Sequence, residues 1–165
     1  METHMENNKM LYSHVSVDCV LLGVNEDKLC VLLIERQMDN SDEKRYKLPG
    51  SLIFENEDLD TAAHRVFNEA TGLKRVRLKQ FRSFGSPSRT KNKDDMQWLE
   101  NAMKLKIERI VTVAYLALSK IGRKSNPTNK YNSLAWFPVD ALPSLPFDHK
   151  EIIEAAVEEI REWVE

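Results

Sequence analysis

Residues 48–73 read LPGSLIFENEDLDTAAHRVFNEATGL, and this stretch decides the fold of the chain. A Pro-Gly turn leads into a short apolar run, and an acidic loop follows. Apolar side chains then recur with the period of an α-helix, at Leu59, Ala62, Ala63, Val66, Phe67 and Ala70. Asp58 suits the N-cap of this helix, and Gly72 suits its C-terminal stop. The stretch therefore predicts a turn, a strand, a loop and an amphipathic helix, in that order.

The same residues resemble the signature box of the Nudix (MutT-like) superfamily. The box reads Gly, five residues, Glu, seven residues, Arg-Glu, apolar, any residue, Glu-Glu, any residue, Gly, apolar. The chain matches this pattern at Glu57, Arg65, Phe67, Glu69, Gly72 and Leu73. It departs from the pattern where Ser51 replaces the first glycine and where Val66 and Ala70 replace two glutamates. The resemblance implies the Nudix fold, an α/β (α+β) domain with a mixed β-sheet sandwiched between helices (α/β/α).

These departures bear on chemistry. In the family, the box glutamates bind magnesium or manganese, which activates water and neutralises a pyrophosphate. Such a cation needs several oxygen ligands close together, and Val66 and Ala70 supply none. Glu69 and Glu57 are the box carboxylates that remain, so any metal would have to bind there. We therefore expect no catalytic residue and no required cofactor. Magnesium is needed only if the domain hydrolyses its ligand.

Strand patterns flank the box on both sides. Residues 15–24 and 29–34 predict a hairpin that turns at residues 25–27. Residues 76–84 predict a half-exposed strand with a bulge, and residues 110–118 and 134–137 predict two more strands. Apolar residues within 91–108 fit a short inserted helix that covers a pocket, packs on a partner or only lengthens a loop. The last predicted helix buries one face, made of Ile152, Ile153, Ala156, Val157, Ile160 and Val164.

Two local patterns allow alternative interpretations. Asp148 and Glu151 have the spacing of a capping box at the start of the last helix, whereas Asp148 and His149 would otherwise form an acid–base pair. We predict the cap. Cys19 and Cys30 lie in apolar strands without metal-ligand spacing, which favours reduced core thiols over a disulfide.

Length and charge limit the remaining possibilities. With 165 residues and a formal net charge of −2, the chain suits one domain, over residues 13–165. Residues 1–12 are polar and predict a disordered segment or the remnant of a tag. No apolar run reaches the length of a membrane span, and no signal peptide is visible. We therefore expect a cytoplasmic protein without a membrane partner.

A basic run and two arginines are candidates for ligand binding. Residues 74–93 contain eight Lys or Arg and no acid, which fits a solvated face or a phosphate-binding surface. Ser86-Pro-Ser-Arg89 resembles a loop of ADP-ribose-type Nudix proteins, although Thr90 replaces its aspartate, and Arg109 resembles a later arginine. Arg65 either orients Glu69 and the box loop or forms a surface ion pair. The candidate ligand-binding residues are therefore Glu57, Arg65, Glu69, Arg89 and Arg109. Their pocket is expected between the box helix, the loop at 86–89 and the strand near 109.

The box residues and the sequence Pro146-Phe-Asp-His149 together resemble the sensor domain of Nudix-related transcriptional regulators. This resemblance implies a small effector, either an ADP-ribose-type nucleotide or a sugar such as arabinose, and a homodimer. It also implies that DNA is contacted only through a winged-helix domain that this chain lacks. The chain is then either the sensor of a longer protein or a stand-alone relative.

Two alternatives from other functional classes remain. One is an active magnesium-dependent Nudix hydrolase of a nucleoside diphosphate-linked substrate, similar to an ADP-ribose pyrophosphatase, which recruits Glu55 or Asp60. The other is a protein-interaction module without a small-molecule pocket.

Overall fold

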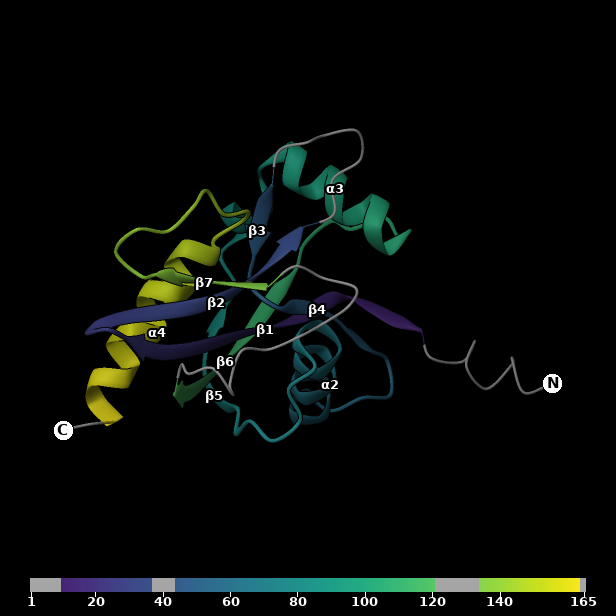
Figure 1. Cartoon of the computed structure of the whole chain (residues 1–165). Coiled ribbons are helices and arrows are strands. Elements are labelled where there is room, and N and C mark those ends of the chain that lie inside the picture. The colour runs from purple at the N-terminus through teal and green to yellow at the C-terminus, as the bar shows by residue number, and fades with distance from the viewer. Residues whose placement is uncertain (1–9, 37–43, 121–133, 164–165) are drawn as a thin grey trace.

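The computed structural model describes residues 10–36, 44–120 and 134–163, which form one mixed sheet with helices around it (Figure 1). The strands are β1 (Leu11–Asn25), β2 (Lys28–Arg36), β3 (Arg45–Lys47), β4 (Gly50–Phe54), β5 (Lys79–Phe84), β6 (Val111–Lys120) and β7 (Leu134–Pro138). The helices are α2 (Leu59–Thr71), the short 3₁₀ helix η1 (Pro87–Thr90), α3 (Lys93–Met103) and α4 (His149–Trp163).

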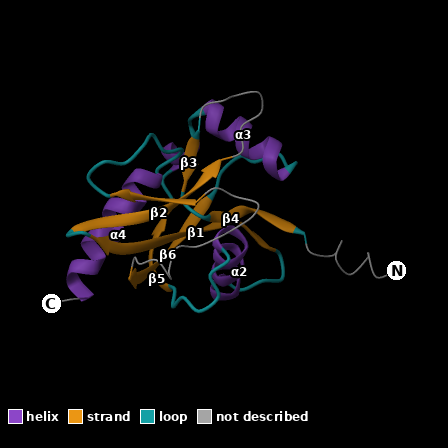
Figure 2. Ribbon diagram, in the orientation of Figure 1, coloured by secondary structure: helices purple, strands orange, loops and turns teal. Residues whose placement is uncertain are grey.

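The sheet runs in the order β3-β2-β1-β6-β5, with β4 paired to β1 and β7 paired to β2. β1 is parallel to β6 and antiparallel to β2, so the sheet is mixed. Helices α2 and α4 lie on its two faces (Figure 2). Alternate β1 residues serve the two sides, because Val17 and Leu21 pack with α2 whereas Val20 and Leu22 pack with α4. The predicted mixed sheet between helices is confirmed.

The helix α2 begins and ends where the sequence predicts. Asp58 accepts a hydrogen bond from the Thr61 backbone N–H at 2.8 Å. Gly72 has a left-handed φ of 77°, and its N–H bonds the Asn68 carbonyl at 2.8 Å. The predicted apolar face is buried apart from Leu59, which is partly buried against the same core.

The predicted hairpin is also confirmed, with Glu26 and Asp27 at positive φ in its turn. Its first strand begins at Leu11, four residues earlier than the sequence predicts. Cys19 and Cys30 are buried free thiols, as predicted, and burial raises the pKa of both.

Some predicted boundaries were wrong. β5 begins at Lys79, because Val76 and Leu78 pack against the α2 side of the core before the strand pairs with β6. The predicted bulge is present between Gln80 and Arg82. The inserted helix is confirmed as α3, and α4 buries its predicted face, although Val164 lies outside the described residues. Residues 1–9 and the loops at 37–43 and 121–133 also lie outside them. No helix in the described ranges is long and apolar enough to cross a membrane.

Candidate functional site

The box loop is held in place by Arg65. Its Nε donates to Glu57 Oε2 at 2.6 Å and its Nη2 donates to Glu57 Oε1 at 2.8 Å. The Phe54 N–H also donates to Glu57 Oε1, at 3.1 Å. Both oxygens of Glu57 are thus engaged within the box, and the hydrogen bonds from Arg65 hold the pKa of this carboxylate below its ordinary value. Both interpretations of Arg65 describe part of this geometry, because it orders the box loop through Glu57 and also pairs with Glu69 on the helix surface.

The other box positions divide between surface and core. Glu69 is exposed on α2, with Oε2 at 3.4 Å from Arg65 Nη1. Val66 and Ala70 are only 4% and 9% exposed. Val66 packs in the same apolar core as Phe67. Hydrocarbon therefore lies against the sheet where the family pattern places two glutamates.

The geometry of these residues does not fit a magnesium site. The carboxylate of Glu57 is already engaged by Arg65, and Glu69 lies on the helix surface within 3.4 Å of the same guanidinium. Across residues 10–36, 44–120 and 134–163, no group of three or more His, Cys, Asp or Glu side chains could hold a metal ion.

A cavity of about 50 Å³ lies on the other side of β4, beneath α3. The strands supply its floor, α3 supplies its roof, and the segment before α4 closes one side. Its lining includes Ser16, Asp18, Lys47, Gly50, Ser51, Leu52, Arg89, Thr90, Trp98, Leu99, Met103, Ile110, Thr112, Phe147 and His149. Three roles were considered for the inserted helix, and α3 has the first of them, because it covers a pocket.

Buried polar groups on the floor of this cavity form a hydrogen-bonded network. The Leu48 N–H donates to His149 Nδ1 at 3.2 Å, so the ring proton lies on Nε2, which faces Asp18 Oδ2 at 3.4 Å. Burial acts to raise the pKa of Asp18, but His149, Lys47 and Arg89 outweigh it and hold that pKa below its ordinary value. Burial also lowers the pKa of Lys47, and Asp18 opposes that shift.

Gly50 allows β4 to approach this polar network closely. A Cβ at residue 50 would lie 1.9 Å from Asp18 Oδ1 and 2.9 Å from the Val17 carbonyl oxygen. Any side chain would therefore displace the carboxylate. Lys47 Nζ donates to the Gly50 carbonyl at 3.2 Å, which joins β3 to the same corner of the cavity.

Arg89 forms one wall of the cavity and is only 7% exposed. Its Nε and Nη2 donate to the two oxygens of Asp148 at 3.0 and 2.9 Å, and its Nη1 donates to the Ile110 carbonyl at 3.0 Å. Asp148 does precede α4, and its carbonyl accepts from the Ile152 N–H at 3.0 Å, but its side chain binds Arg89 where a cap was predicted. The acid–base alternative was wrong, since Asp148 and His149 bind different partners.

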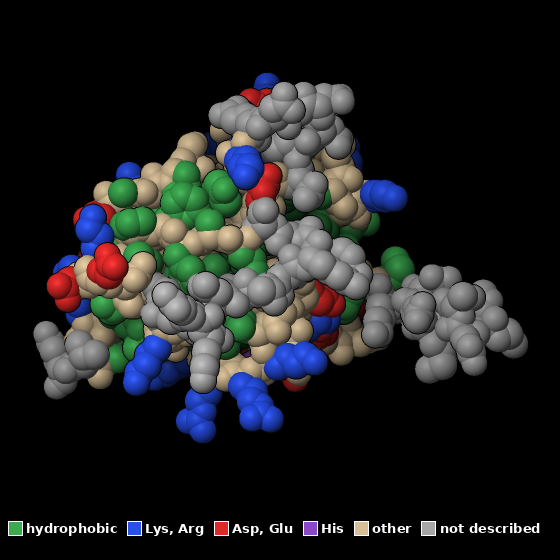
Figure 3. All heavy atoms as spheres, viewed as in Figure 1, with side chains coloured by type: hydrophobic (Ala, Val, Ile, Leu, Met, Phe, Trp, Pro, Cys, Tyr) green, Lys and Arg blue, Asp and Glu red, His purple; other side chains and the backbone are tan. Residues whose placement is uncertain are grey.

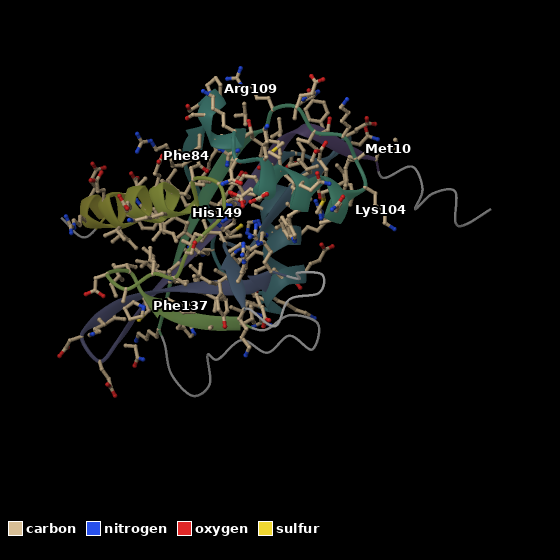
Figure 4. The ribbon with its side chains drawn as sticks, turned by 90° about the horizontal axis from the view of Figure 1, so that it is seen from above. Met10, Phe84, Lys104, Arg109, Phe137 and His149 are labelled. Carbon is tan, nitrogen blue, oxygen red and sulfur yellow. The ribbon has the colours of Figure 1, made fainter. Side chains whose placement is uncertain are left out.

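The predicted pocket is found only in part. Arg89 and the start of β6 line the cavity, but no residue of α2 does. Arg109 is exposed, bonds the Gly85 carbonyl at 2.8 Å and lies at the periphery, away from His149 (Figure 4). Sequence reasoning missed Asp18 and Lys47, and it considered His149 only as an acid–base partner of Asp148. One signal was available, because Asp18 is the only acid in β1 and is flanked by apolar residues.

Apart from Arg89, the basic residues of 74–93 lie outside the cavity lining. The side chains of Lys74, Arg75, Arg77, Lys79 and Arg82 are exposed, and none lines the cavity. Figure 3 shows Lys and Arg side chains along the lower edge of the molecule. Both interpretations of this run, a solvated face and a phosphate-binding surface, therefore remain predictions.

Comparison with known proteins agrees with the box and the fold. A sequence model of the NUDIX domain matches residues 12–156. The chain belongs to the Nudix family. Over 147 residues it is 29% identical to the ADPR responsive transcriptional repressor NtrR of Acinetobacter baylyi, covering 86% of this chain. The chain spans about half the length of that relative, 52%.

Solved Nudix structures share the fold. The NUDIX domain of Shewanella oneidensis NrtR, crystallised with ADP ribose, aligns with a TM-score of 0.62 at 23% identity, over 97% of this chain and 99% of that one. A structure of Shewanella oneidensis NrtR aligns with a TM-score of 0.67 at 25% identity, over 90% of this chain and 64% of that one. A mutT/nudix protein of Listeria innocua aligns with a TM-score of 0.64 at 23% identity, over 92% and 96%.

Proposed function

We propose that this Nudix domain binds an ADP-ribose-type nucleotide as the effector-sensing part of a transcriptional regulator, without hydrolysing it efficiently. The observation that carries the proposal is the burial of Val66 and Ala70 in the core, where the box pattern has glutamates. The likeness to an ADPR responsive repressor supports the choice of ligand. The cavity beneath α3, in turn, favours a binding domain over an interaction module without a pocket.

The predicted ligand-binding residues take different parts in this proposal. Glu57 and Arg65 order the loop between β4 and α2, and Arg89 fixes the cavity wall through Asp148. Glu69 and Arg109 are exposed and stay proposed contacts for the outer part of the ligand.

Signal transmission would be a shift between two arrangements of a cytoplasmic homodimer. The effector can shift the balance only by its difference in affinity for the two arrangements. DNA would be read by a winged-helix domain, as the family resemblance implies.

Calorimetry with ADP-ribose, related nucleotides and pentoses tests the proposal. We expect saturable binding of at least one of these ligands without added metal. Failure of all of them to bind would contradict the proposal.

A hydrolase is the second candidate, because Arg65 holds the box loop in order and Glu69 is retained beside it. Solved ADP-ribose pyrophosphatases share the fold, including one of Streptococcus suis at a TM-score of 0.53 and 16% identity, over 91% of this chain and 93% of that one. Magnesium-dependent cleavage of ADP-ribose that is lost in Glu69→Gln would establish this alternative.

A further inference from the structure

Three consecutive residues tie the start of α4 to three other parts of the fold. The Phe147 N–H donates to Asp95 Oδ2 on α3 at 2.8 Å. The side chain of Asp148 binds Arg89 of η1, and that of His149 binds the turn between β3 and β4. All three parts supply or adjoin residues that line the cavity. The start of α4 is therefore connected to several walls of the cavity at once.

Phe147 has a backbone conformation that phenylalanine rarely adopts. Its φ is 53°, in the left-handed region, whereas residues with a Cβ strongly prefer negative φ. Such a conformation persists only where the surrounding contacts impose it. Here Asp95 holds the N–H, and the ring packs against the apolar cluster that contains Leu52, Met96 and Ile110. Without these contacts, we expect Phe147 to return to a negative φ.

Asp95 connects Phe147 to the helix that covers the cavity. Its Oδ1 lies 3.3 Å from Arg36 Nη1, and the side chains of this ion pair are 14% and 5% exposed. The same guanidinium lies 4.9 Å from the centre of the ring of Trp98, which lines the cavity. Met96 is the only residue of α3 that is buried, so little apolar packing holds this helix down. An outward movement of α3 would carry Asp95 away from the Phe147 N–H.

A ligand of nucleotide size needs such a movement. The cavity has a volume of about 50 Å³, whereas pockets for small molecules usually measure roughly 300–1,000 Å³. The floor of the cavity belongs to paired strands of the sheet, and α3 is the wall with the least buried packing. We therefore expect α3 to be displaced when such a ligand enters.

We propose that Phe147 is a conformational switch that couples the position of α3 to the start of α4. When α3 lies over the cavity, Asp95 holds Phe147 at positive φ, and the first turn of α4 has a fixed start. When α3 moves outward, Phe147 returns to a negative φ and this first turn loosens. Transmission between distant sites requires an element of this kind, with two discrete arrangements. The role of a ligand rests on the effector binding proposed above, whereas the coupling between the two helices does not.

Hydrogen exchange of the ligand-free chain, followed by NMR, tests the coupling. Asp95→Ala removes the acceptor of the Phe147 N–H. The Ile152 N–H, which bonds the Asp148 carbonyl at 3.0 Å in the first turn of α4, should then exchange about tenfold faster, because a hydrogen bond to a charged acceptor is lost. Asp94→Ala is the matched control, since Asp94 is exposed in the same turn of α3, and it should leave this exchange unchanged.

The amides of α2 show whether the effect is specific to α4. They should exchange equally in Asp95→Ala and in the original protein. An Ile152 rate that is the same in the Asp95→Ala and Asp94→Ala variants would overturn the switch, and so would an equally large rise in α2, because general destabilisation would then explain it. If Asp95→Ala does not fold, Arg36→Met combined with Asp95→Leu removes the same acceptor without leaving an unpaired charge.

Substitutions of Phe147 itself test its conformation in solution. Phe147→Gly and Phe147→Ala both remove the ring, but only glycine adopts a positive φ without a steric cost. The glycine variant should therefore have the higher urea midpoint. A higher midpoint for the alanine variant would contradict the positive φ on which the switch depends.

The same exchange measurement with ADP-ribose separates the switch from the proposed function. Saturating ADP-ribose should change exchange in α3 and in the first turn of α4 together, and Asp95→Ala should keep the change in α3 but lose that in α4. A change confined to α3 in the original protein would overturn the switch and leave effector binding intact. If ADP-ribose does not bind, that finding counts against the proposed function, and the ligand-free comparison still decides the switch.

Discussion

Replacing Asp148 by Asn should strongly destabilise the fold, because it leaves a buried guanidinium without its counter-charge. The Arg89 and Asp148 side chains are 4% and 10% exposed, and two hydrogen bonds of 3.0 and 2.9 Å join them. Removing one partner of such a buried pair costs about 3–5 kcal/mol. For a chain of this size, this corresponds to a fall in Tm of roughly 6–20 °C.

Urea unfolding followed by tryptophan fluorescence measures this loss, and a double-mutant cycle assigns it to the pair. Arg89→Met combined with Asp148→Leu should recover at least half of the stability lost in Asp148→Asn, since no unpaired charge remains. Glu154→Gln, on the exposed face of α4, is the control and should change stability by less than about 0.5 kcal/mol. A loss below about 1 kcal/mol for Asp148→Asn would refute the reasoning.

Three further predictions concern the cavity floor and the box. Gly50→Ala should lower the free energy of unfolding by roughly 1–3 kcal/mol, as measured by urea unfolding, and weaken ligand binding, as measured by calorimetry. Gly85→Ala is the control and should be tolerated, because its added Cβ would lie 3.8 Å from its nearest neighbours. The folded-state pKa of Asp18 is depressed, so the stabilisation from its carboxylate is complete above about pH 4 and is lost as pH falls through the folded pKa. The free energy of unfolding of Asp18→Asn should therefore change less with pH in this acid range than that of the original protein. An unchanged pH dependence would contradict this. Val66→Glu should destabilise the fold by about 3–5 kcal/mol without restoring turnover, and a stable variant that cleaves ADP-ribose with magnesium would count against the account.

Local signals predicted much of the fold. The caps of α2 depend on hydrogen bonds within one turn, so Asp58 and Gly72 could be assigned from their neighbours in sequence. The same reasoning was wrong for Asp148, although the local spacing was right. There a guanidinium 59 residues away supplies two charge-assisted hydrogen bonds, which are stronger than a cap.

The floor of the cavity could not be predicted in this way. Asp18, Lys47 and His149 belong to three separate segments that only the folded sheet brings together. In the sequence, each of these residues taken alone is consistent with an ordinary structural role, such as a strand end or a helix start. The close approach of Gly50 to Asp18 is likewise a tertiary feature, because its local sequence indicates only a turn after proline.

Phosphorus NMR of ADP-ribose tests in one experiment whether this domain, as we propose, recognises a nucleotide and does not cut it. The spectrum would be recorded with the protein, first without metal and then with excess magnesium. We expect the diphosphate resonances to shift or broaden when protein is added and then to keep their intensity after magnesium is added. Their replacement by phosphomonoester signals after magnesium is added would contradict this expectation.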